Sequence, residues 1–256
     1  MTIPKLSIVI PVRNEGLNLK IMLRILRGVV EVPHEVLVVY DGLDDDSIPV
    51  VTTLQKDYAS LRGVHNTIGR GVVNALKAGV AAADGEYVLI FAADEVGPVL
   101  AIEDMLVLME QGCDFVSATR YAHGGRRLGG SVIGGALSKL ANRLFRAAAG
   151  CVLTDSTTGI KMFRRDVFAR LDLQAPPVGW AVTFEMAMKA QLAGLRLGEV
   201  PIISIDRLYG GQSTFRLGPW VVAYLRWFAW GAYNLRRSTH RPSVTVRIPA
   251  SVLAEA

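Results

Sequence analysis

The chain has few cysteines and no long uninterrupted run of apolar residues. Only two cysteines occur, Cys113 and Cys151, and their spacing fits no metal site. We therefore expect free thiols in a reducing compartment, not a disulfide framework. No segment offers the roughly 18 consecutive apolar residues that a membrane-spanning helix needs. The first residues also lack a basic segment followed by a long apolar one, so no signal peptide is expected.

Internal repeats, low-complexity linkers and nucleic-acid-binding motifs are absent from the sequence as well. Charged residues make up 20% of the chain and hydrophobic residues 51%, which excludes a disordered protein. The length of 256 residues fits one large domain with a sizeable core. A net charge of +5 suits an anionic ligand or a lipid headgroup surface. Without a recognition motif, this basic excess does not indicate a nucleic-acid partner.

The first half of the chain alternates predicted strands with predicted helices. Buried strands are expected at Leu6–Val12, His34–Gly42, Glu86–Asp94 and Cys113–Tyr121, and helices at Asn14–Val30, Asp44–Ala59, Gly69–Gly85 and Ala101–Gly112. This alternation predicts an α/β fold with a mostly parallel central sheet and helices on both faces. Ligands of such sheets bind beyond the carboxyl ends of the strands.

The second half is less regular. We expect a flexible glycine-rich loop at Gly124–Gly135, a strand and a helix within Asp155–Leu171, and a helix and a strand within Thr183–Ile202. Amphipathic helices are predicted at Ala136–Gly150 and over 218–237. Residues 1–237 are read as one domain and 238–256 as a peripheral tail.

Six segments together resemble the conserved blocks of inverting family 2 glycosyltransferases, and in particular dolichol-phosphate mannose synthase-like members. They are "LSIVIPVRNEGLNL", "EVLVVYDGLDDDS", "GRGVVNALKAGVAAADGEYVLIFAAD", "TRYAHGG", "DSTTGIKMFRRDVF" and "VPIISIDRLYGGQSTFRL". Their order and spacing, over roughly residues 5 to 220, carry the resemblance. It implies a GT-A fold, a nucleotide-sugar donor bound by residues 1–120, an acceptor half at 121–217, and Mg²⁺ or Mn²⁺.

Asp94, at the end of a predicted strand, is the candidate metal ligand. The resemblance aligns Ala92, Ala93 and Asp94 with the family's DXD metal motif, so the first carboxylate of that motif is missing. Mg²⁺ often needs only one or two protein carboxylates besides phosphate oxygens, so Asp94 can suffice at a cost in affinity. The alternative is a structural cap at the strand end.

The other candidate donor-binding residues follow the predicted strands or open a helix. The full set is Pro11, Arg13, Asn14, Glu15, Asp41, Arg70, Gly71, Asn74, Ala92, Ala93, Asp94 and Arg120. An ionised Asp41 can accept two hydrogen bonds from a base or a ribose. The alternatives are a helix cap at Arg13–Glu15 and a tight turn at Gly69–Gly71. The acidic run Asp44–Asp46 is interpreted as a solvated turn.

The candidate catalytic and acceptor residues lie mainly in the second half. Phosphate contacts are expected from Arg120, Arg207 and Arg216, with Ser138 and Ser213 as hydrogen-bond donors, and Asp94, Asp155, Glu185 and Arg207 form the catalytic set. If the acceptor is a hydroxyl, Glu185 is the expected base. If it is a lipid phosphate, no base is needed and both Asp155 and Glu185 position other groups. His65, His123 and His240 receive no role.

We therefore expect an inverting, metal-dependent transferase that moves a hexose to a polyprenyl phosphate, in the cytoplasm or at the inner face of the membrane. The alternatives are a saccharide or small-molecule hydroxyl as acceptor, or a catalytically silent sugar-nucleotide-binding protein. Aromatic and basic residues in the helix over 218–237 suit a headgroup surface. They are Trp220, Val221, Tyr224, Trp227, Phe228 and Tyr233, with Arg226, Arg236 and Arg237. A buried core helix is the alternative.

Overall fold

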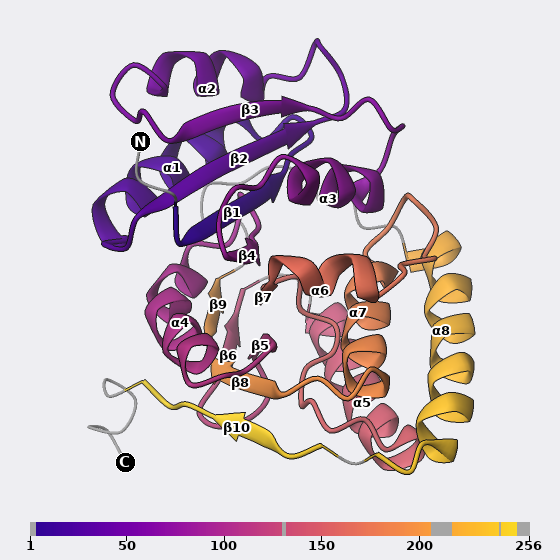
Figure 1. Cartoon of the computed structure of the whole chain (residues 1–256). Helices are drawn as coiled ribbons and strands as arrows, with labels where there is room; N and C mark the ends of the chain where they lie inside the picture. Colours follow the sequence, from indigo (N-terminus) through magenta and orange to yellow (C-terminus); the bar gives the residue numbers. More distant parts are fainter. Residues whose placement is uncertain (1–3, 130–131, 206–216, 241, 250–256) are drawn as a thin grey trace.

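The computed structural model describes residues 4–129, 132–205, 217–240 and 242–249, which share one eight-stranded sheet (Figure 1). The strand order is β10-β8-β5-β7-β4-β1-β2-β3. The strands are β1 (Leu6–Pro11), β2 (His34–Tyr40), β3 (Leu61–His65), β4 (Tyr87–Ile90), β5 (Phe115–Thr119), β7 (Lys161–Arg164), β8 (Leu197–Pro201) and β10 (Val244–Val246). Only β7 runs antiparallel to its neighbours β4 and β5. The predicted mostly parallel sheet is confirmed.

Helices cover both faces of the sheet, because the inner strands are apolar on both sides. In β1, Ile8 and Ile10 belong to one core and Val9 to the other. One face is covered by α1 (Gly16–Val29), α2 (Ser47–Leu54), the 3₁₀ helix η1 (Gly97–Ala101) and α4 (Ile102–Glu110). The other carries α3 (Val72–Ala81), α5 (Val132–Ala149), α6 (Arg165–Arg170), α7 (Ala181–Leu192) and α8 (Leu217–Arg237).

Short strands are the main departure from the predicted elements. A separate two-stranded sheet joins β6 (Arg126–Leu128) to β9 (Ile203–Ile205). The segment Gly124–Gly135 is therefore not simply a glycine-rich loop, since it contains β6 and the start of α5. The tail contributes β10, which pairs with β8 at the edge of the main sheet. Arg247 anchors it further, because its Nε donates to Asp104 Oδ1 at 2.5 Å.

The aromatic side of α8 faces the core. Trp227 is only 7% exposed, and Phe228 packs against Phe145 with the rings tilted and their centroids 5.3 Å apart. A Cβ at Gly231 would lie 2.1 Å from Met188 Sδ, so α8 packs directly on α7 there. The expectation that Trp227 faces a membrane is wrong. The side chains of Trp220 and Val221 lie outside the described residues. Within the described chain, no helix is long and apolar enough to cross a membrane.

Candidate functional site

Three segments meet at one edge of the sheet because β4, β1 and β2 are parallel neighbours. Pro11 pairs with Val39, and Val9 pairs with Ile90. The chain leaves these strands at Val12, Asp41 and Phe91, so the predicted donor-binding residues of all three segments follow the same edge of the sheet. Of these residues, Arg13 and Asn14 are exposed, whereas Asp41 and Asp94 are half-buried.

The acidic loop before α2 binds the turn that follows β1. Asp45 Oδ2 accepts a hydrogen bond from the Asn14 N–H at 3.1 Å, and Asp46 Oδ1 accepts one from the Gly16 N–H at 2.8 Å. Asp45 is 7% exposed, so its expected place in a solvated turn is wrong. The first amides of α1 are thus satisfied by the neighbouring loop, where negative charge favours the helix dipole. Asn14 itself adopts a positive φ of 54°.

Asp41 ties the end of β2 to the start of α3. Its carboxylate accepts hydrogen bonds from Asn66 Nδ2 at 2.7 Å and from the Gly71 N–H at 2.9 Å. Gly71 has a φ of 119°, and a Cβ there would lie 2.3 Å from Pro177 O. This position therefore requires glycine. The close approach to Pro177 gives a structural reason for this glycine, and the Asp41 carboxylate oxygens keep further lone pairs for a ligand.

Asp94 lies on the segment that joins β4 to η1. A Cβ at Gly97 would lie 1.8 Å from Ile203 O, so this segment packs closely against β9. Ala93 is buried and Asp94 half-buried. Among the described residues, no three His, Cys, Asp or Glu side chains form a metal-binding cluster. A single carboxylate fits Mg²⁺ or Mn²⁺ only when phosphate oxygens and water complete the shell.

A buried ion pair lies at the end of β5. Arg120 Nε donates to Asp155 Oδ2 at 2.7 Å, and Arg120 Nη2 donates to Asp155 Oδ1 at 3.1 Å. Nη2 also donates to Thr157 Oγ1 at 2.9 Å. The Asp155 side chain is fully buried, whereas that of Arg120 is 10% exposed. Among the described residues, Arg120 Nη1 makes no hydrogen bond, and Glu95 also interacts with the guanidinium electrostatically.

The pair keeps both partners charged. Burial acts to lower the pKa of Arg120, but the Asp155 carboxylate outweighs burial and raises this pKa above its ordinary value. Burial also acts to raise the pKa of Asp155, and Arg120 reverses this so that the carboxyl pKa is lowered. The result is a fixed guanidinium at the carboxyl end of β5.

Residues of α5 and of the segment after Asp155 complete this cluster. Ser138 Oγ lies 3.0 Å from Thr157 Oγ1, and Asn142 Nδ2 donates to Thr157 Oγ1 at 2.9 Å. Asn142 Oδ1 accepts from the Ser156 N–H at 2.8 Å. Ser138, predicted as a phosphate donor, thus lies beside the Arg120 pair. Sequence reasoning missed Asn142 and Thr157, although Asn142 follows Ser138 by one helical turn.

The contacts of Glu185 indicate a structural role for its carboxylate. It is fully buried within α7, and its two oxygens accept from the backbone N–H groups of Gln174 at 2.7 Å and Ala175 at 2.8 Å. Lys189 Nζ lies 2.8 Å from the same carboxylate. These contacts hold the loop before α7 and do not direct Glu185 toward an acceptor. Arg207, Ser213 and Arg216, also predicted at the site, lie outside the described residues.

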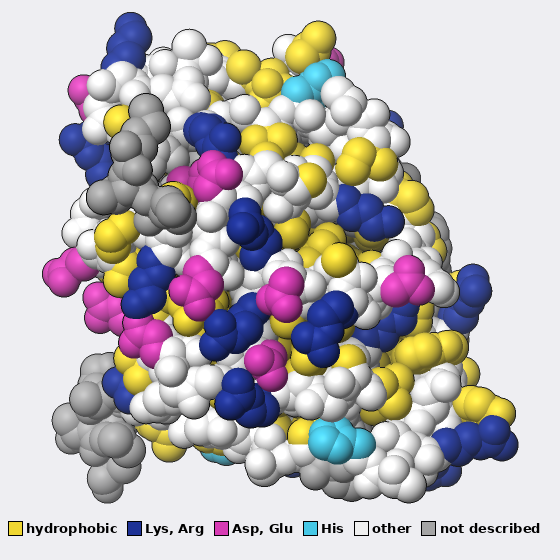
Figure 2. Space-filling model, in the orientation of Figure 1, with side chains coloured by type: hydrophobic (Ala, Val, Ile, Leu, Met, Phe, Trp, Pro, Cys, Tyr) yellow, Lys and Arg dark blue, Asp and Glu magenta, His cyan; other side chains and the backbone are white. Residues whose placement is uncertain are grey.

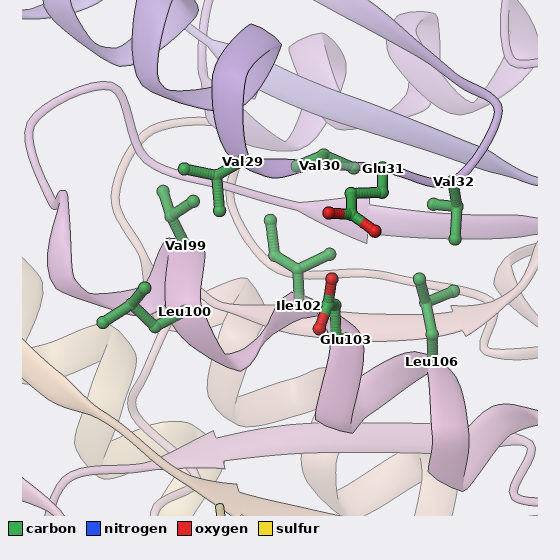
Figure 3. Close-up of a pocket in the computed structure, with 9 residues that line it drawn as sticks. All are labelled: Val29, Val30, Glu31, Val32, Val99, Leu100, Ile102, Glu103 and Leu106. Carbon is green, nitrogen blue, oxygen red and sulfur yellow. The ribbon is translucent and has the colours of Figure 1, made fainter. Parts of the chain in front are cut away.

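Among the described residues, a cavity of about 100 Å³ lies between the segment before β2 and the η1–α4 segment. Figure 3 shows Glu31 and Glu103 pointing toward each other in it. It lies near the amino end of β2, away from the carboxyl edge. A wider recess of about 680 Å³ is lined by Arg143 and Arg146 of α5 and by Pro242 and Val244.

Known proteins share the sequence pattern of this chain. The family described as Glycosyl transferase family 2 matches residues 7–172. Dolichol-phosphate mannosyltransferase from Pyrococcus furiosus is 25% identical over 225 residues, which cover 87% of this chain and 62% of that protein. Glycosyltransferase AglD from Haloferax volcanii is 28% identical over 210 residues, which cover 77% of this chain and 32% of that protein. The chain therefore spans less than two thirds of either relative.

Solved structures share the fold. Glucosyl-3-phosphoglycerate synthase from Mycobacterium tuberculosis, in complex with Mn²⁺, uridine diphosphate and glucosyl-3-phosphoglycerate, superposes with a TM-score of 0.69 at 17% identity, over 90% of this chain and 80% of that one. A complex of that enzyme with Mg²⁺ and uridine diphosphate gives 0.66 at 18% identity, with the same coverage. The predicted GT-A-type fold is confirmed. Since the family match covers well over half of the sequence, the chain belongs to glycosyl transferase family 2.

Proposed function

We propose that this chain transfers a hexose, with inversion, from a GDP- or UDP-linked donor to a polyprenyl phosphate at a membrane surface. The observation that carries the proposal is the buried Arg120–Asp155 pair, which leaves Arg120 Nη1 free of hydrogen bonds to described residues. A guanidinium oriented in this way suits a phosphate oxygen. The Pyrococcus furiosus relative, named a dolichol-phosphate mannosyltransferase, supports the same acceptor class.

The donor is proposed to bind along the edge where β4, β1 and β2 end. Arg13 and Arg70 are exposed basic side chains that follow β1 and precede α3, respectively, and they suit a nucleoside diphosphate. Asp41 is half-buried and can accept from the base or ribose. The structural neighbour that was solved in complex with uridine diphosphate supports a nucleotide-linked donor.

Asp94 is proposed to hold Mg²⁺ or Mn²⁺ together with the donor diphosphate. Such an ion, when bound, neutralises the negative charge that develops on the departing diphosphate. The neighbouring residues then orient the sugar so that one face of its anomeric carbon is open to the acceptor. The new bond joins that carbon to the acceptor oxygen, while the old bond breaks with its electron pair going to the diphosphate.

The acceptor is proposed to be anionic, because the candidate base Glu185 is engaged by other residues in the part of the chain that the structure describes. Both Glu185 oxygens accept hydrogen bonds from backbone amides, and the side chain is fully buried. A phosphate oxygen is already ionised at neutral pH and needs no base, unlike a sugar hydroxyl. Arg120 Nη1 and Ser138 Oγ would hold that phosphate at the end of β5.

The membrane-facing surface is proposed to be formed by α5 and α8, which pack against each other. Neither helix contains an acidic residue. Their exposed apolar residues are Leu137, Leu140, Leu144, Val222, Leu225 and Tyr233, and their exposed basic residues are Lys139, Arg143, Arg146, Arg226, Arg236 and Arg237. Along the edge formed by α8, Figure 2 shows basic and hydrophobic side chains together. An acid-free apolar and basic surface fits anionic lipid headgroups.

A transfer assay tests the reaction. With GDP- or UDP-hexose and Mg²⁺ or Mn²⁺, we expect product with a polyprenyl phosphate and none with the corresponding unphosphorylated polyprenol. The product should carry the inverted anomeric configuration, measured by NMR. Transfer only to saccharide hydroxyls would refute the acceptor assignment. Donor binding without any transfer, with each metal ion tested, would instead support a catalytically silent sugar-nucleotide-binding protein. That alternative rests on the missing carboxylate at Ala92.

Vesicle binding tests the surface. The parent chain should sediment with anionic vesicles and not with zwitterionic ones. Removing two basic residues, as in Arg143→Gln/Arg146→Gln, should weaken binding by about 30-fold, because each charge near such a surface contributes about 1 kcal/mol. The control variant Lys20→Gln/Arg24→Gln removes two exposed basic residues from α1 and should bind as the parent does. A parent chain that stays in the supernatant would refute the membrane contact.

A further inference from the structure

A buried carboxylate in β8 has no role in the site described so far. Glu199 is 1% exposed. Its Oε1 accepts hydrogen bonds from the Thr154 N–H at 2.6 Å and from Thr154 Oγ1 at 2.9 Å. Thr154 directly precedes Asp155, the partner of Arg120. Glu199 therefore binds Thr154, the residue next to Asp155 of the buried pair.

A hydrogen-bond chain continues from Thr154 to both neighbours of Arg120. Thr154 Oγ1 lies 2.6 Å from Thr119 Oγ1, which accepts from the Tyr121 N–H at 3.3 Å. An ionised carboxylate only accepts. Thr154 must then donate to Glu199, and Thr119 must donate to Thr154. The charge on Glu199 thus fixes the direction of a chain that includes residues on both sides of Arg120.

Several titratable groups face Glu199. Lys161 of β7 is fully buried, and its Nζ donates to Ser117 Oγ at 3.1 Å. His123 Nε2 lies 3.9 Å from Glu199 Oε2. Asp155 and Cys151, from the segment after α5, interact with it electrostatically. Burial raises the pKa of Glu199 to about 7, and burial lowers the pKa of Lys161 to about 8. Glu199 therefore changes charge near neutral pH.

We propose that Glu199 is a positioning residue for the acceptor phosphate, because its ionised carboxylate directs the hydrogen bonds that align Arg120 with Asp155. The inference rests on the proposed acceptor. When Glu199 is protonated it can donate as well as accept, so the direction of the Thr154–Thr119 chain is no longer unique. The guanidinium then loses part of its fixed orientation, and the acceptor binds less tightly.

Glu199→Gln tests the charge with little change in shape. At pH 8 the KM for polyprenyl phosphate should rise about tenfold, the effect of losing one charge-assisted hydrogen bond, while the KM for the donor stays constant. As pH falls through 7, this KM should rise more steeply in the parent than in the variant, so that the two values converge. The acceptor phosphate titrates in both proteins, so the ratio of the two KM values isolates Glu199. A ratio independent of pH would overturn the proposal.

Thermal stability separates positioning from a loss of structure. A raised carboxyl pKa means that Glu199 favours folding at low pH and that this contribution is lost as pH rises from about 4.5 to 7. Relative to the parent, Glu199→Gln should therefore be more stable at pH 8 than at pH 5. A melting temperature of the variant well above the assay temperature at pH 8 then excludes unfolding as the cause of weaker acceptor binding. Lower relative stability at pH 8 would contradict this account.

Two further variants complete the design. Glu35→Gln alters another buried carboxylate, which accepts from Ser7 Oγ at 2.6 Å near the opposite edge of the sheet, and should leave the acceptor KM unchanged. Thr119→Val interrupts the chain without removing charge and should raise the acceptor KM as Glu199→Gln does. Thr119→Ser restores the hydroxyl and should return the KM to the parent value. Equal acceptor KM values for Thr119→Val and Thr119→Ser would refute the role of the hydrogen-bond chain through Thr119.

A spectroscopic measurement does not depend on turnover. The side-chain ¹⁵Nε–¹H signal of Arg120, assigned by its absence in Arg120→Lys, reports the bond to Asp155. It should shift or broaden in Glu199→Gln at pH 8 and stay in place in Glu35→Gln. If the parent transfers nothing to polyprenyl phosphate, the proposed function fails, and this signal still tests whether Glu199 positions Arg120. An unchanged signal in Glu199→Gln overturns the inference.

Discussion

Asp94→Ala should lower the rate of hexose transfer by about 100-fold or more and leave the fold intact. Charge stabilisation by a bound divalent ion contributes several kcal/mol to the barrier, and each 1.4 kcal/mol corresponds to a tenfold change in rate. Asp94 is half-buried and lies beyond β4, whose strand pairing with β1 and β7 does not involve it. Initial rates with Mg²⁺ and Mn²⁺, together with circular dichroism, measure the two effects.

Ala92→Asp provides the complementary variant. It places a carboxylate two residues before Asp94, where the DXD motif of the resemblance has one, and should tighten Mn²⁺ binding in a titration. Binding unchanged from the parent would mean that the segment after β4 directs residue 92 away from the metal. Undiminished transfer by Asp94→Ala, or by the parent in excess EDTA, would refute the metal assignment.

The long elements of the fold could be predicted because each carries its own pattern. The β1 strand is apolar on both faces, as a central parallel strand must be. The alternation of such strands with helices along the chain indicates the α/β class. The strands β6, β9 and β10 have three residues each. Such strands exist because a partner strand lies alongside, and no periodicity in so few residues reports that partner.

The site could be predicted where chain direction alone brings residues together. Parallel strands end at one edge, so the segments of Asp41 and Asp94 meet without any knowledge of side-chain packing. The partners of a buried carboxylate depend on distant segments instead. Asp45 is buried where the Asn14 amide of the turn after β1 donates to it, and Glu185 where a loop ten residues away folds over it. The sequence pattern around each resembles an exposed helix start.

The burial of α8 shows that the packing partners of apolar residues are also hard to predict from the sequence. Aromatic residues with neighbouring arginines suit both a membrane surface and a core. The contact with α7 decides between them, because Gly231 lets the helices approach and Trp227 then lies beside Lys189, with its ring centroid 5.7 Å from Nζ. Val222, Leu225 and Tyr233, on the opposite side of α8, remain exposed.

Arg120→Met should reduce both acceptor binding and stability. Without the guanidinium the phosphate loses its charge-assisted donors, so kcat/KM for polyprenyl phosphate should fall by about 100-fold. The fully buried Asp155 is left without its partner, which should lower the free energy of unfolding by roughly 3–5 kcal/mol. Kinetics at saturating donor and urea unfolding at pH 7 measure the two losses.

A second substitution separates these effects. Asp155→Asn in the Arg120→Met background removes the uncompensated charge, and should recover much of the lost stability but none of the acceptor binding. Recovery of both would mean that Arg120 serves the fold alone.

The pH dependence of stability tests the same ion pair independently. In the parent, the pKa of Asp155 is lowered, so the ion pair stabilises the fold at neutral pH and this contribution is lost as pH falls through the carboxyl range. In Arg120→Met, burial acts without its counterion and should raise the pKa of Asp155 above its ordinary value. Protonation then relieves the buried charge, so the stability gap between parent and variant should narrow from pH 7 to pH 4. A gap that stays constant over this range would show that the pKa of Asp155 is not raised in the variant, and that the pair is not the source of the stability.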